Sequence, residues 1–214
     1  MVLPLILRTT STLALVVGGG SVGQRKIRTL LRAGMAVRVV SPGEIPSEFV
    51  DLPSLTWLRV PYQREHLEDV QLVVAAAPPN VNRNVVADAQ KCGIWVNSAD
   101  DPTTGNVFFP ASVQRGDLLI SVSTGGAAPS LARRIRERLE QQFDDSIGEW
   151  IAILESFRPE ILHCIADESK RRALFDHLSE WAWLDRFRIQ GEAPVREAIR
   201  TEIDRVVASG RRPV

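Results

Sequence analysis

Short apolar runs rich in β-branched residues alternate with amphipathic stretches over residues 1–100 of this chain. The amphipathic stretches carry apolar residues at helical spacing, as Ile27, Leu30 and Leu31 do after the first run. Strands that alternate with helices in this way predict an α/β fold built on a doubly wound parallel sheet. The runs that predict strands are 13–17, 36–41, 55–60, 71–77 and 94–97.

The pattern changes after residue 100. Two further strands are predicted on either side of an Arg115-Gly116 turn, and Pro129 then opens a helix at the favoured first position. From residue 147 onward the pattern is helical throughout. We therefore expect three parts, which are an α/β domain over 1–113, a small α+β segment over 114–147 and a helical domain over 148–214. The late strands are expected at 106–113 and 117–123, and the late helices at 147–156, 159–166, 169–184 and 194–208.

A glycine-rich loop joins the first strand to the first helix. Gly18, Gly20 and Gly23 fit the spacing G-x-G-x-x-G, with a strand before it and a helix after it. The first glycine permits a tight turn, the second lets a pyrophosphate approach bare backbone, and the third lets the helix lie against the strand. The unpaired N–H groups that open the helix favour an anion. This context favours a Rossmann-type dinucleotide site over a glycine turn that binds nothing.

The second strand ends where the adenosine ribose of a dinucleotide lies in such folds. Ser41, Pro42 and Gly43 occupy this position, and Glu44 follows directly. No arginine or lysine occurs in 41–45 to receive a 2′-phosphate, so we expect NAD rather than NADP as the cofactor. Pro42 and Gly43 also read as a simple turn, and the two interpretations are compatible. Ala77, at the end of the fourth strand, leaves space for a flat ligand.

Two adjacent carboxylates, Asp100 and Asp101, follow the fifth strand at the expected cleft. Neighbours in sequence rarely face the same way, so one at most is expected to point inward. A carboxylate there can accept a proton or stabilise positive charge beside a nicotinamide. The alternative is that both begin an Asp-Pro turn, which is common turn chemistry.

A second candidate site is the turn that precedes the helix at Pro129. A Gly-Gly turn before a helix offers backbone N–H groups to an anion. Each arginine of the helix can also bind a carboxylate through two parallel hydrogen bonds. The alternative for at least two of these arginines is a solvated helix face. The residues concerned are Thr124, Gly125 and Gly126 in the turn and Arg133, Arg134, Arg136 and Arg138 in the helix.

Composition narrows the class of protein. Lys plus Arg and Asp plus Glu both number 26, so the net charge is zero, which argues against a general nucleic-acid binder. No apolar run approaches the ~18 residues that span a membrane. Cys92 and Cys164 form no C-x-x-C pair and are expected to pack as small apolar residues. The histidines have no metal-ligand neighbours at useful spacing, so no metal site is expected. We expect a cytoplasmic protein with no membrane partner.

Several stretches taken together resemble the precorrin-2 dehydrogenase family, the dehydrogenase portion of siroheme synthases. The resemblance runs in order over residues 1 to 140, and its motifs are specific in combination although each is modest alone. The stretches are Val-Val-Gly-Gly-Gly-Ser-Val-Gly-Gln-Arg-Lys at 16–26, Val-Val-Ser-Pro at 39–42, Val-Asn-Ser-Ala-Asp-Asp-Pro at 96–102, Phe-Pro-Ala at 109–111 and Ser-Thr-Gly-Gly-Ala-Ala-Pro-Ser-Leu-Ala-Arg at 123–133.

The resemblance implies NAD-dependent oxidation of precorrin-2 to sirohydrochlorin, on the route to siroheme or cobalamin. It implies a homodimer with residues 114–147 at the interface, a large polycarboxylated tetrapyrrole as substrate, and Asp100 as the catalytic acid/base residue. It also assigns dinucleotide contacts to Ser21, Val22, Pro42 and Gly43. Some members carry a phosphorylated serine where this chain has Thr124, so such regulation is not expected here.

Two other functions remain open at this point. Some members of the family also insert Fe²⁺ into sirohydrochlorin, and a bifunctional enzyme of that kind needs no dedicated metal ligands. A Rossmann module that senses NAD without catalysis is the alternative from another class.

Overall fold

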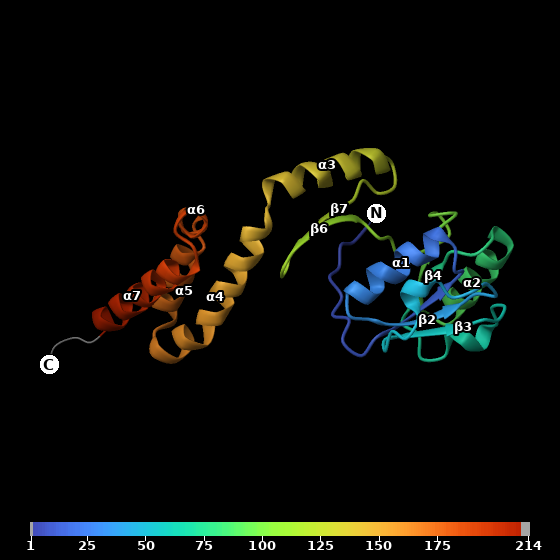
Figure 1. Cartoon of the computed structure of the whole chain (residues 1–214), viewed down its shortest axis with the longest axis horizontal. Helices are drawn as coiled ribbons and strands as arrows, with labels where there is room; N and C mark the ends of the chain where they lie inside the picture. The colour runs from blue at the N-terminus through green and yellow to red at the C-terminus, as the bar shows by residue number, and fades with distance from the viewer. Residues whose placement is uncertain (1, 211–214) are drawn as a thin grey trace. The chain divides into compact units, whose positions relative to one another are not determined.

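The computed structural model describes residues 2–210 and divides into two compact units, Met1–Phe109 and Pro110–Val214 (Figure 1). Each unit has its own core and is described by itself. The boundary predicted after residue 113 and the further division at 147 stay predictions.

The first unit is a five-stranded sheet in the order β3-β2-β1-β4-β5, with every neighbouring pair parallel. This order confirms the predicted Rossmann-type sheet. The chain adds β2 and β3 on one side of β1 and then β4 and β5 on the other, and folds of this type bind ligands at this switch point between β1 and β4. The strands are β1 (Leu13–Val17), β2 (Ala36–Val40), β3 (Leu55–Leu58), β4 (Leu72–Ala75) and β5 (Trp95–Ser98), and the helices are α1 (Ser21–Arg32), α2 (Pro79–Lys91) and the short 3₁₀ turns η1 (Ser47–Phe49) and η2 (Arg64–Leu67).

The two faces of this sheet bury separate apolar clusters, and β1 contributes to both. Ala14 and Val16 pack with Ile27 and Leu30 of α1, whereas the alternate residues of β1 pack with the apolar residues of α2. Side chains of a strand alternate between its faces, so a strand covered on both sides is apolar throughout. This explains the unbroken apolar runs in the sequence.

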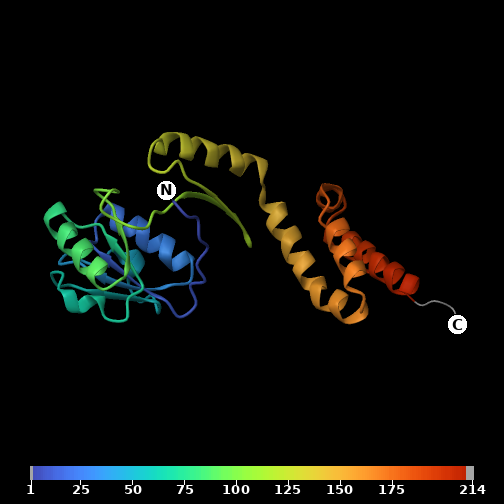
Figure 2. The ribbon, with the colours of Figure 1, turned by 180° about the vertical axis from the view of Figure 1, so that it is seen from behind.

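The second unit begins with an antiparallel hairpin of β6 (Ala111–Arg115) and β7 (Leu118–Val122), which turns at Gly116 with φ 54°. Five helices follow within the described residues (Figure 2). The last four enclose an aromatic and aliphatic core that includes Trp150, Phe157 and Leu184. The predicted helical C-terminal region is therefore confirmed. The helices are α3 (Pro129–Gln142), α4 (Asp145–Cys164), α5 (Glu168–Leu178), α6 (Trp181–Gln190) and α7 (Glu192–Gly210).

Several predicted boundaries were wrong. The strand expected at 106–113 begins at Ala111, because the N–H groups of Asn106 and Val107 bond to Val96 O instead. The helices expected at 147–156 and 159–166 form one helix that continues through Pro159. The helix expected at 169–184 breaks at Ser179 and Glu180, where no glycine or proline marks the break. Both cysteines are exposed rather than packed inside.

No helix among residues 2–210 is long and apolar enough to cross a membrane.

Candidate functional site

The glycine loop between β1 and α1 is shaped by close backbone approaches. Gly18 has φ 109°, and a Cβ there would overlap the carbonyl of Ala76 beyond β4. A Cβ on Gly23 would overlap the carbonyl oxygen of Gly18. A Cβ on Gly20 would meet nothing within 4 Å, so the loop faces open space at this point. The first and third glycines therefore serve packing, and the second leaves bare backbone accessible, as the spacing predicted.

The amino terminus of α1 opens directly from this loop. Its N-cap is Gly20, and no side chain caps it. The N–H groups of the first turn, from Ser21 to Gly23, are left for a ligand at the positive end of the helix dipole. Gln24 steadies the loop, since its Nε2 donates to Gly19 O at 2.9 Å. This open, uncapped end fits the pyrophosphate of a dinucleotide.

The end of β2 borders the same loop. Ser41 is buried, and its Oγ lies 3.0 Å from the place that a Cβ of Gly19 would take. Trp57 of β3 fills the other side of that space. The turn through Pro42 and Gly43 therefore starts beside the loop, where the sequence placed the adenosine. Ala77 also reaches the loop, because its backbone nitrogen lies 2.7 Å from a Cβ built on Gly18.

The two carboxylates after β5 have different environments. Asp100 accepts hydrogen bonds at Oδ1 from Ser98 Oγ at 2.9 Å and from Asn82 Nδ2 at 2.7 Å. Asp101 instead accepts from the N–H and hydroxyl of Thr103 at 2.9 and 2.6 Å, which is turn chemistry. The sheet thus holds Asp100 at the edge where the loop lies, and Asp101 builds the turn.

The pKa of Asp100 lies below the usual value for an aspartate. Desolvation by neighbouring groups on its own raises the pKa, but hydrogen bonds from Ser98, Asn82 and the backbone N–H groups of Asp100 and Asp101 outweigh it and stabilise the ionised form. Asp100 is therefore an anion at neutral pH and a weaker base than an ordinary aspartate.

Asn82 is a site residue that the sequence did not point out. It is 2% exposed on α2, and its Oδ1 accepts from the N–H of Ala77 at 2.9 Å. Because that N–H can only donate, the amide oxygen must face it, so the NH₂ group faces Asp100. Asn82 thus ties the end of β4 to the carboxylate after β5. Asn82 could have been found from the sequence, because it is a polar residue on the otherwise apolar face of the predicted helix.

Lys26 lies one turn further along α1 and is partly buried. Its Nζ sits 3.9 Å above the ring of Phe109. Burial lowers its pKa to about 8, and the nearby charge of Arg25 adds to the effect.

The second candidate site, in the second unit, is a self-contained turn. Thr124 Oγ1 accepts from Ala128 N at 3.1 Å, and Ser123 Oγ accepts from Gly125 N at 3.2 Å. These bonds occupy donors that were expected to meet an anion. The Arg133 side chain on α3 is 68% exposed, and its Nε lies 3.7 Å from Glu137 Oε1. The substrate role predicted for Thr124, Gly125, Gly126 and Arg133 stays a prediction.

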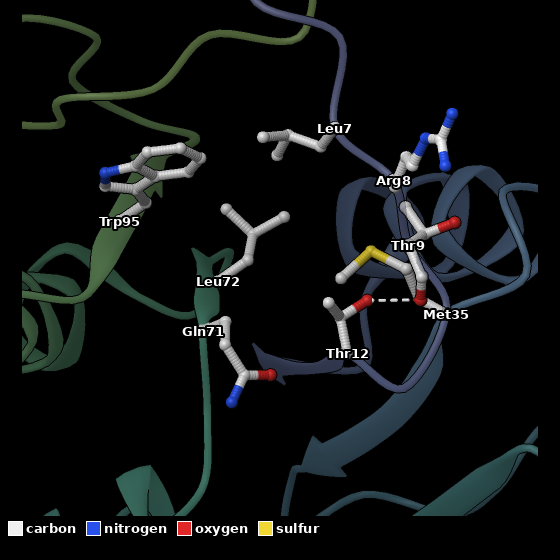
Figure 3. A pocket seen from close by; sticks show the side chains of 8 residues that line it. All are labelled: Leu7, Arg8, Thr9, Thr12, Met35, Gln71, Leu72 and Trp95. Atoms are coloured by element: carbon white, nitrogen blue, oxygen red, sulfur yellow. Dashed lines mark hydrogen bonds between the residues drawn. The ribbon is translucent and has the colours of Figure 1, made fainter.

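A small cavity of about 110 Å³ lies at the opposite edge of the first unit's sheet (Figure 3). Leu72 and Trp95 line it at the amino ends of β4 and β5. Ligands of such sheets bind at the carboxyl ends, so this cavity is not the dinucleotide site. Within residues 2–210 no cluster of three or more His, Cys, Asp or Glu side chains could hold a metal ion.

Comparison with known proteins agrees with this geometry. The family model described as putative NAD(P)-binding matches residues 5–111, and the one described as sirohaem biosynthesis protein central matches residues 115–142. The match confirms the predicted nicotinamide dinucleotide cofactor.

Named relatives point to the same family. A siroheme synthase of Chromobacterium violaceum is 36% identical over 97% of this chain and 44% of its own length, and one of Pseudomonas putida is 39% identical over 81% and 38%. The chain thus spans well under half of the curated relatives it matches. A solved precorrin-2 dehydrogenase, SirC, is 26% identical with a TM-score of 0.77, covering 95% of this chain and 100% of that one. The chain therefore belongs to the NAD(P)-binding family formed by the precorrin-2 dehydrogenases and the dehydrogenase portions of siroheme synthases.

Proposed function

We propose that this chain oxidises precorrin-2 to sirohydrochlorin with NAD. The observation that carries the proposal is the Asp100 carboxylate, fixed by Ser98 and Asn82 at the sheet edge that also presents the uncapped end of α1. The solved precorrin-2 dehydrogenase, which this chain covers in full, supports the choice of substrate.

The roles of the residues follow from their positions. Bound NAD supplies the acceptor for a hydride. The loop and the first turn of α1 hold the pyrophosphate, and Ala77 leaves room beside β4. Asp100, held as an anion, stabilises the positive charge that develops on the tetrapyrrole as the hydride leaves. Its low pKa makes this electrostatic role the principal one, and its exposure lets it pass the released proton to water.

Substrate contacts are assigned to the second unit. Precorrin-2 carries several carboxylates, which bind best to arginines and to backbone N–H groups. Gly125 and Gly126 adopt φ 62° and 87° and leave open space around their backbone. Because Gly125 N already donates to Ser123 Oγ and Ala128 N to Thr124 Oγ1, we assign the carboxylates to the N–H of Gly126, to the hydroxyl proton of Thr124 and to Arg133 on α3.

A homodimer is the assembly we propose. Leu131 and Ile135 are 52% and 39% exposed one turn apart on α3, and Leu119 of β7 is 42% exposed. A two-stranded sheet is marginal alone, so a partner that covers these residues would stabilise it. The cytoplasm is the compartment we propose, because exposed free thiols such as Cys92 and Cys164 suit a reducing environment.

The test is anaerobic incubation with precorrin-2 and NAD⁺, following NADH absorbance and the spectrum of the tetrapyrrole. Asp100→Ala is expected to abolish NADH formation while calorimetry still detects NAD⁺ binding. Asp101→Asn, a control that removes the charge of the adjacent turn residue, is expected to retain activity. Full activity of Asp100→Ala contradicts the role of Asp100. Wild-type protein that binds NAD⁺ and forms no NADH supports a sensing module instead.

Insertion of Fe²⁺ into sirohydrochlorin is a second candidate. The ionised and exposed Asp100 favours it, because chelation must remove two protons from the macrocycle and needs only a transient acceptor. The test follows the absorbance of sirohydrochlorin after Co²⁺ is added, with and without the protein. A rate of metal insertion that is no higher with the protein than without it contradicts this candidate.

A further inference from the structure

Two opposite charges meet where β2 and β3 end. The strands pair Val40 with Leu58, and Ser41 N donates to Leu58 O at 3.1 Å. Arg59, the next residue, therefore leaves the sheet beside the turn that carries Glu44. The guanidinium Nη2 of Arg59 lies 4.0 Å from Glu44 Oε1.

The turn that carries Glu44 starts beside the glycine loop. Ser41 bonds to β3 on one side, and on the other its Oγ lies 3.0 Å from the place of a Cβ on Gly19. In folds of this type the ribose of the adenosine lies at the end of the second strand. A carboxylate at that position bonds the 2′-hydroxyl of NAD, and an arginine nearby receives the 2′-phosphate of NADP. Both chemistries are present here.

We propose, on the basis of the dinucleotide site above, that Glu44 and Arg59 together select NAD over NADP. Arg59 is a latent receptor for the 2′-phosphate, and Glu44 excludes that phosphate by repelling it and by neutralising Arg59. The side chains are 58% and 91% exposed, so the pair between them is weak. The exposed guanidinium of Arg59 is free to reorient, so it can bind a doubly charged phosphate when Glu44 no longer repels that phosphate.

The origin of the preference thus differs from the one the sequence indicated. Residues 41–45 contain no cation, but the neighbouring strand supplies one. Discrimination against NADP then depends on a single carboxylate rather than on the absence of a basic residue.

Titration calorimetry with ADP and 2′,5′-ADP tests this without any turnover. Wild-type protein is expected to bind ADP more tightly than 2′,5′-ADP. Glu44→Gln is expected to tighten 2′,5′-ADP binding about tenfold, the size of one charge-assisted hydrogen bond at a partly exposed site, and to change ADP binding less than about twofold. Adding Arg59→Gln in the same chain is expected to remove the gain.

Glu48→Gln is the matched control, because it removes one carboxylate from a different Arg–Glu pair, with Arg28, in the same unit. It is expected to leave both affinities unchanged. A gain in the control equal to that of Glu44→Gln overturns the proposal, as does an unchanged ratio in Glu44→Gln or a gain that survives loss of Arg59. Failure of wild-type protein to bind either ADP or NAD⁺ overturns the dinucleotide site itself and is thereby distinguished.

Discussion

Replacing Asn82 by leucine is expected to destabilise the first unit and to raise the pKa of Asp100. Leucine keeps the branched skeleton of asparagine, with bulkier methyl groups in place of the amide oxygen and nitrogen, and it removes both polar contacts of the amide, with Ala77 N and with Asp100 Oδ1. Asn82 is 2% exposed, so both hydrogen bonds are lost at a buried position.

The magnitude follows from the two bonds. Leaving the Ala77 N–H without its acceptor costs about 1–3 kcal/mol, and the extra apolar surface of leucine offsets part of this. We expect a net loss of about 1–2 kcal/mol in the free energy of unfolding. Asp100 loses one of the donors that hold its pKa down, so its pKa rises toward the usual value or above it.

Urea denaturation measures the stability, and carboxyl carbon shifts followed by NMR against pH measure the pKa. Activity that depends on the Asp100 anion is retained above its pKa and falls as pH drops through it, so the acid limb of the rate profile should move to higher pH in the variant. Asn84→Leu, an exposed position on the same helix, is the control. A stability loss no larger than that of the control, together with an unchanged pKa, would refute the reasoning.

Three further predictions concern other contacts. Lys26→Met is expected to stabilise the protein at pH 7 by about 1–2 kcal/mol, discounted from the ~3 kcal/mol that the fall in pKa to about 8 would imply. The pKa of Lys26 is lower in the folded protein than in the unfolded chain, so the charged lysine lowers the free energy of unfolding most below pH 8. Denaturation at several pH values should therefore show the stability difference between variant and wild type shrinking between about pH 8 and 10.5. A difference that does not change with pH contradicts this. Gly23→Ala is expected to weaken NAD⁺ binding at least about tenfold in calorimetry, because the new Cβ overlaps Gly18 O and must shift the loop; unchanged affinity would show that the loop accommodates the methyl. Gly148→Ala is expected to lower the melting temperature by several degrees, because the added methyl overlaps the backbone of Arg115 and Gly116. This loss outweighs the helix propensity of alanine, which exceeds that of glycine by about 1 kcal/mol. A rise in melting temperature would contradict the expectation.

The first unit shows how far local pattern can reach. Apolar runs, helical spacing and the three glycines specify strands, helices and the loop between them, because each depends on residues a few positions apart. The position of Ser41, Pro42 and Gly43 beside the loop also follows from sequence, since consecutive parallel strands end at one edge. The helical tail was less predictable: α4 continues through Pro159 and the break at Ser179 has no glycine or proline, because core packing outweighs local propensity there.

Only the tertiary structure decided which polar groups meet. The spacing alone did not distinguish Asp100 from Asp101, and only the family resemblance singled out Asp100. In the structure Asn82, 18 positions before Asp100, distinguishes the two carboxylates. Nothing in the sequence pattern connects Glu44 with Arg59. The two side chains meet because β2 and β3 lie side by side. Hydrogen bonds and ion pairs act over a few ångströms in space, whereas sequence patterns report the face of an element on which a residue lies. For this protein the sequence determined the fold, the dinucleotide loop and the family, and the folded sheet determined the state of the Asp100 carboxylate and the pairing of Glu44 with Arg59.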